Sequence, residues 1–99
     1  MDGSIRIIQQ DERTLIKLEG MLDQEMAANL TGIAKKTTPP VVLDLQQVPH
    51  ITVAGSRAVL HFYQLHNKKP GLRNANADVI STLRLTGTSR YSDLVTDEK

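Results

Sequence analysis

The side chains best suited to chemistry are concentrated in one short stretch, "HITVAGSR", at residues 50–57. It combines two hydroxyls, Thr52 and Ser56, with a glycine at position 55 and a cation at Arg57. A helix that begins near Gly55 would expose unpaired backbone N–H groups and the positive end of its dipole, which attract a phosphate, a carboxylate or an acidic side chain of a partner. A helix start capped by Thr52 or by water, with Gly55 permitting a close backbone approach, explains the same residues without a ligand. Local sequence favours this structural explanation, because neither Walker spacing nor a GxGxxG pattern is present.

Histidines are the next group that could do chemistry. His61 and His66 are five residues apart on one predicted helix, and His50 comes before the loop. Zinc pairs use spacings that bring both rings to one side, so we expect solvated or partly buried histidines and no metal site. The sequence has no cysteine, which excludes thiolate ligands and disulfides.

Carboxylates and serines give no catalytic arrangement. We interpret Glu19 as a residue on the wet face of a strand, Asp23 as a helix cap and Asp44 as a strand-end residue, so no acid and base form a pair. None of the serines lies in a sequence resembling a nucleophile elbow; they include positions 56, 81, 89 and 92. The sequence therefore predicts a non-enzymatic protein without a cofactor.

Composition narrows the class of protein. The 99 residues suffice for one domain, spanning 1–99, and the contents of 39% hydrophobic and 3% aromatic residues predict an aliphatic core. A net charge of +1 gives no strong reason to bind nucleic acid or an acidic membrane. No segment approaches the roughly 20 apolar residues that span a bilayer, and no signal-peptide pattern begins the chain, so we expect a soluble cytoplasmic protein.

The elements that must position these residues follow from hydrophobic periodicity. Apolar residues alternate with polar ones at Ile5 and Ile7 and in "TLIKLEG", which predicts an antiparallel strand pair with one solvent-exposed face. The apolar run "VVLDL" predicts a central strand covered on both faces, and a weak strand follows Gly71. Helical spacing predicts helices over residues 23–36, 55–68 and 78–86, and we expect the polar tail from Tyr91 to fray.

This order predicts an α/β fold, a small mixed sheet flanked by helices. The stretch at 50–57 then joins the carboxyl end of the central strand to a helix. Such loops are a common place for function in α/β proteins.

Three segments together resemble the STAS domain, a family named for sulfate transporters and anti-sigma factor antagonists. They are "LEGMLD" at 18–23, "VVLDLQQVPHITVAG" at 41–55 and "VISTLRLTG" at 79–87, and the resemblance covers nearly the whole chain. It implies a sheet of four or five strands with helices packed on it. It also implies a role like that of bacterial single-domain members, which bind an anti-sigma factor that is a serine kinase and are released when phosphorylated.

The chain departs from the family's pattern at the phosphorylated loop. That loop typically reads Asp-Ser-Ser-Gly or Asp-Thr-Ser-Gly, whereas residues 52–55 here are "TVAG", so Ala54 occupies the acceptor position without a hydroxyl. Thr52 replaces the usual aspartate and Val53 makes the loop more apolar. Since phosphorylation adds roughly −1.5 to −2 charges, which Ala54 cannot carry, we expect the usual switch to be lost. Thr52 and Ser56 are the candidates for a displaced acceptor, but a helix-cap hydroxyl at Thr52 and a first-turn position for Ser56 explain them without phosphorylation. The family's fourth strand also looks shortened after Gly71.

The resemblance gives a leading hypothesis and an alternative. The leading one is a STAS-type regulator, similar to an anti-sigma factor antagonist, that binds a kinase-like anti-sigma factor or a signalling scaffold. The alternative is an accessory STAS subunit of a membrane transporter that docks on its ATPase. An enzyme would require activity that depends on Thr52, Ser56 or a histidine. The predicted partner-binding residues are Asp23, Thr52, Val53, Ala54, Gly55, Ser56 and Arg57.

Overall fold

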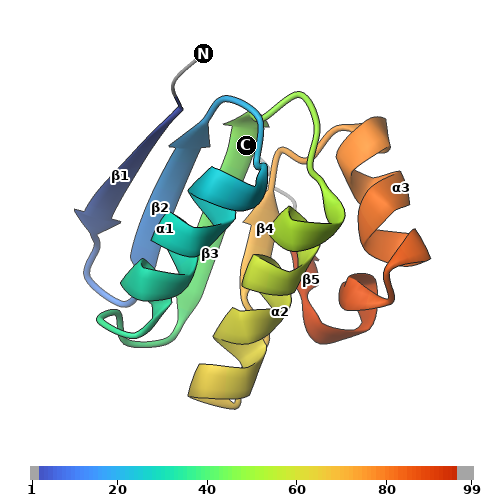
Figure 1. Ribbon diagram of the computed structural model, residues 1–99. Helices are drawn as coiled ribbons and strands as arrows, with labels where there is room; N and C mark the ends of the chain where they lie inside the picture. The colour runs from blue at the N-terminus through green and yellow to red at the C-terminus, as the bar shows by residue number, and fades with distance from the viewer. Residues whose placement is uncertain (1–2, 96–99) are drawn as a thin grey trace.

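A five-stranded sheet and three α-helices make up the computed structural model, which describes residues 3–95 (Figure 1). The strands are β1 (Ser4–Gln9), β2 (Thr14–Glu19), β3 (Val41–Gln47), β4 (Gly71–Arg73) and β5 (Asp93–Val95). The helices are α1 (Gln24–Ala34), α2 (Val53–His66) and α3 (Ala77–Leu85), and a short 3-10 helix, η1, covers Thr88–Tyr91. The predicted mixed α/β architecture is confirmed. Within the described residues, no helix is both long and apolar enough to cross a bilayer.

The strands lie in chain order, β1-β2-β3-β4-β5. The first two are antiparallel, as predicted, and every later neighbour is parallel. Crossovers between parallel strands are right-handed, so four parallel strands laid down in one direction place all the connecting helices on the same face. Figure 1 shows α1 and α2 lying across that face of the sheet. The opposite face, here called the helix-free face, carries no α-helix from residues 3–95.

The central strand β3 is buried on both of its faces, as predicted, but the two faces are covered differently. Val42 and Leu43 are both buried, as expected. Leu43 pairs in register with Ile16 and belongs to the core under the helices, whereas Val42 belongs to the helix-free face. A Cβ built on Gly71 would lie 3.3 Å from a Val42 methyl and 2.7 Å from a methyl of Val95. Valine methyls therefore fill the space above Gly71, and β3 is covered on both faces as predicted, by helices on one face and by side chains of neighbouring strands on the other.

An aliphatic core lies between the helices and the sheet. On α1, the apolar residues at helical spacing, Met26, Leu30 and Ala34, are buried, and Ile33 packs against them. Phe62, the single phenylalanine, is fully buried. On α2, Ala58 and Phe62 are buried, but Leu65, which continues their helical spacing, is 44% exposed, so the buried stripe ends before it.

The helix boundaries differ from the predicted ones by one or two residues, and the C-terminal tail differs more. Helix α2 begins at Val53, two residues before Gly55, because Thr52 and not the glycine caps it. The tail expected to fray contains β5, an edge strand that pairs with β4 and whose Asp93 amide donates a further hydrogen bond to the carbonyl of Pro70, at 3.0 Å. Strand β4 has three residues, in keeping with the predicted shortening.

Candidate functional site

The first turn of α2 is capped by a side chain. Thr52 has an extended backbone, and its Oγ1 accepts a hydrogen bond from the amide of Gly55, at 3.2 Å. The same hydroxyl donates to the carbonyl of Leu22, at 3.3 Å. A threonine before a helix commonly satisfies one of the unpaired N–H groups in this way. Thr52 therefore caps α2, as the explanation of this loop without a ligand expects.

Helix α1 begins beside α2. An isolated parallel bridge joins Leu22 to Ile51: the Leu22 amide donates to the carbonyl of His50 and the Thr52 amide donates to that of Leu22, both at 3.1 Å. Asp23, the next residue, caps α1 by accepting from the amide of Met26, at 3.1 Å. The two helix N-termini thus lie at the same edge of the sheet, where β2 and β3 end (Figure 1). This arrangement brings Asp23 next to the stretch at 50–57, as the sequence analysis expected.

Gly55 is required by a close approach. A Cβ at this position would lie 2.4 Å from the carbonyl oxygen of Leu22 and 2.8 Å from its Cγ. Real side chains do not tolerate such a distance to backbone, so only glycine lets α2 pack this closely on the loop that precedes α1. Gly55 is buried, and it supports the surface without being part of it.

Ser56 points into the protein. Its residue is fully buried, and within the described residues its Oγ has no hydrogen-bond partner. Its carbonyl accepts from the hydroxyl of Thr88, at 3.4 Å, which ties the first turn of α2 to η1. A kinase could reach this hydroxyl only after the start of α2 had opened, so the structure argues against Ser56 as an acceptor in the folded domain.

The exposed part of this edge is largely apolar. Val53 is 54% exposed, Ala54 is half-buried and Arg57 is exposed. Met21, which the sequence analysis missed, is 48% exposed in the segment that leads into α1. Its exposure could have been predicted from the sequence, since Met21 is an apolar residue in the loop before the predicted cap Asp23. We call this set the helix-start surface; it consists of Met21, Asp23, Thr52, Val53, Ala54 and Arg57.

The histidines are separated in the structure. Nδ1 of His50 lies 2.7 Å from Oδ2 of Asp78, an exposed ion pair that joins the loop before α2 to α3. Nε2 of His66 lies 3.0 Å from the carbonyl oxygen of Ala34, between α2 and α1. Among residues 3–95, no three histidine or carboxylate side chains form a group that could hold a metal ion.

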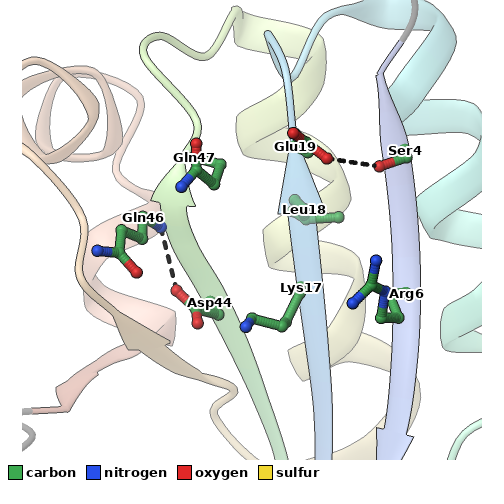
Figure 2. Close-up of a pocket in the computed structure, with 8 residues that line it drawn as sticks. All are labelled: Ser4, Arg6, Lys17, Leu18, Glu19, Asp44, Gln46 and Gln47. Atoms are coloured by element: carbon green, nitrogen blue, oxygen red, sulfur yellow. Dashed lines mark hydrogen bonds between the residues drawn. The ribbon is translucent and has the colours of Figure 1, made fainter.

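Two of the carboxylates considered earlier lie elsewhere, on the helix-free face (Figure 2). Glu19 accepts a hydrogen bond from the hydroxyl of Ser4, at 3.2 Å. Asp44 lies within β3 and is buried, so its description as a strand-end residue is wrong. Its Oδ1 accepts from the amide of Gln46, at 3.1 Å, and from Nδ2 of Asn74, at 3.3 Å.

Comparison with known proteins gives structural matches only. No family model matches the sequence, and no curated protein matches it. Among solved structures, the fold is similar to that of a putative anti-sigma factor antagonist from Thermotoga maritima, with a TM-score of 0.77 and 17% identity over 95% of this chain and 86% of the other. An anti-sigma factor antagonist from Mycobacterium paratuberculosis gives a TM-score of 0.77 and 17% identity, over 94% of this chain and 85% of that one. For unphosphorylated SpoIIAA, also an anti-sigma factor antagonist, the TM-score is 0.67 and the identity 12%, with 97% and 90% of the two chains covered.

These matches extend over nearly the whole chain and include the mixed five-stranded sheet with its three helices. The chain therefore has a STAS-like fold, the fold of the anti-sigma factor antagonists.

Proposed function

We propose that this protein is a non-enzymatic regulator of the anti-sigma factor antagonist type, which binds a kinase-like anti-sigma factor or a signalling scaffold through the helix-start surface. The observation that carries the proposal is the bridge between Leu22 and Ile51, which holds two helix N-termini side by side. Around them, Met21 and Val53 expose apolar side chains next to the charged Asp23 and Arg57. Apolar contacts surrounded by polar groups are typical of a protein interface.

Binding through this surface does not require phosphorylation. Ala54, at the position where the resemblance implies an acceptor, has no hydroxyl and lies in the first turn of α2. The hydroxyl of Thr52 is occupied by two hydrogen bonds, and that of Ser56 is buried. We infer that the protein is constitutively competent to bind, and that its partner or its abundance provides the regulation.

A capture experiment with a matched control tests the interface. Tagged wild-type protein is used to purify partners from the native cell, and the affinity of the captured protein is then measured by calorimetry. Val53→Glu places an unpaired charge in the proposed contact and should weaken binding at least tenfold. Leu65→Glu makes the same chemical change at an exposed site near the other end of α2 and should leave the affinity within twofold.

The identity of the partner separates the hypotheses. An anti-sigma factor or a signalling scaffold supports the proposed class of regulator. A transporter ATPase that binds through the same residues would replace it with the accessory-subunit function. Equal affinities of the wild type and Val53→Glu would remove the helix-start surface from the interface.

A further inference from the structure

The helix-free face of the sheet carries a row of charged side chains in register. Arg6 pairs with Lys17, Lys17 with Asp44 and Asp44 with Arg73, so the row crosses four neighbouring strands from β1 to β4. Side chains at paired positions of a sheet point to the same face. The row therefore brings two cations from β1 and β2 next to each other, with a carboxylate beside them on β3.

Neither cation of this pair forms a salt bridge within the described part of the chain. Arg6 and Lys17 are directly opposite on antiparallel strands, where like charges destabilise the pairing. Across residues 3–95 the single salt bridge is the distant one between His50 and Asp78, so neither cation has a carboxylate within salt-bridge distance there. The carboxylates beside the cations accept hydrogen bonds from uncharged donors, Asp44 from Gln46 and Asn74 and Glu19 from Ser4.

A pocket with a volume of about 200 Å³ opens over these residues. Figure 2 shows Lys17 on β2 between Arg6 on β1 and Asp44 on β3, with Glu19 and Gln47 toward the ends of their strands. The lining residues are Ser4, Arg6, Lys17, Leu18, Glu19, Asp44, Gln46 and Gln47. Seven of these eight side chains are polar or charged, so the pocket suits a hydrated polar molecule better than an apolar one.

We propose that this pocket binds a small metabolite through an oxyanion, a phosphate or carboxylate group, held between the Arg6 guanidinium and the Lys17 ammonium. An anion at this place offsets the repulsion between the two cations, and guanidinium groups match oxyanions with paired N–H donors. The carboxylate of Glu19, at the edge of the pocket, accepts hydrogen bonds from hydroxyl groups of the same ligand. A polyanion such as nucleic acid does not fit, because Glu19 and Asp44 flank the cations and repel a continuous phosphate backbone.

This site is separate from the helix-start surface. The pocket lies on the face opposite the helices, whereas the proposed partner contacts lie at the edge where the helices begin (Figures 1 and 2). Ligand binding can therefore be tested without the partner, and the result does not depend on the proposed function.

Titration of the ¹⁵N-labelled full chain, followed by NMR at constant ionic strength, tests the site. The probes are inorganic phosphate, glycerol 3-phosphate and succinate, which separate a phosphate ligand from a carboxylate one. We expect saturable shifts at β1 and β2 with at least one probe. Arg6→Gln and Lys17→Gln should each weaken that affinity at least fivefold. Glu19→Gln should remove any gain of glycerol 3-phosphate over inorganic phosphate.

The matched control is the double variant Lys68→Gln, Lys69→Gln, which removes exposed cations beyond α2 and should keep the affinity within twofold. Arg6 and Lys17 are themselves exposed, so their variants should keep the dispersed spectrum of the folded protein. Shifts that rise linearly with every probe, or that weaken equally in the control and in Arg6→Gln, would show general screening of surface charge and overturn the proposal.

Discussion

The carbonyl oxygen of Leu22 accepts two hydrogen bonds from Thr52, one from its amide at 3.1 Å and one from its hydroxyl at 3.3 Å. The same oxygen would lie 2.4 Å from a Cβ at position 55. The segment before α1 and the first turn of α2 thus meet at a single backbone group. Changes at this contact should alter both the stability of the domain and the shape of the helix-start surface.

Gly55→Ala should destabilise the protein by about 1–3 kcal/mol, because the added methyl forces the backbone of α2 away from Leu22. The free energy of unfolding in urea measures this change. Gly32→Ala in α1 is the control: beyond the neighbouring residues and the backbone of its own helix, no atom lies within 4 Å of the added Cβ, and replacing a helical glycine should stabilise the protein by about 0.5–1 kcal/mol. Equal effects of the two substitutions would contradict the close approach at Gly55.

Thr52→Ala should lower the free energy of unfolding by about 1 kcal/mol, because α2 loses the side-chain acceptor for the amide of Gly55. Thr52→Ser keeps the hydroxyl and should retain most of the stability. Urea denaturation of the two variants beside the wild type provides the measurement. A serine variant as unstable as the alanine one would mean that the methyl group of Thr52, and not its hydroxyl, matters.

Much of the fold could be predicted from periodicity, since burial leaves a repeating pattern in the sequence. The stripe on α1 and the antiparallel pair of β1 and β2 were found in this way. Strand β5 was not, because its three residues show no apolar alternation and Leu94 is 58% exposed. This strand is held by backbone hydrogen bonds to β4. Backbone pairing at the edge of a sheet requires no particular side chains, so the sequence does not reveal it.

The candidate sites were predictable to different degrees. The resemblance led to the stretch from Thr52 to Arg57, but not to the burial of Ser56, which depends on η1 packing against α2. The row from Arg6 to Arg73 depends on the register of four strands. The paired residues lie ten or more positions apart in the sequence, and hydrophobic periodicity does not tell which residues of two such strands face each other. The pocket on the helix-free face could therefore be recognised only in the structure.

Phe62→Ala should destabilise the protein by about 3–5 kcal/mol, because it removes the largest fully buried side chain of an otherwise aliphatic core. Leu65→Ala, on the same helix but 44% exposed, should cost well under that amount. Both values come from equilibrium denaturation at an unchanged m-value. A loss below about 1 kcal/mol for Phe62→Ala would mean that the surrounding side chains collapse into the space.

Ala54→Asp distinguishes an effect on the stability of the protein from an effect on binding through the helix-start surface. A carboxylate in the first turn of α2 interacts favourably with the helix dipole, so the variant should be as stable as the wild type or more stable, by about 0.3–1 kcal/mol. The same charge lies beside exposed Val53, where a partner would have to desolvate it, so binding of the captured protein should weaken at least tenfold. Ala54→Asn matches the aspartate in size without its charge and should bind more tightly than Ala54→Asp.

Calorimetry on the three proteins, with thermal unfolding of each alone, decides between two interpretations of position 54. If the aspartate variant is stable but fails to bind, negative charge at position 54 controls this interface, although Ala54 itself cannot carry a phosphate. If all three proteins bind equally, position 54 lies outside the contact. Mass spectrometry of wild-type protein from the native cell completes the test, because stoichiometric phosphate on Thr52 or Ser56 would contradict the inference that phosphorylation is not required.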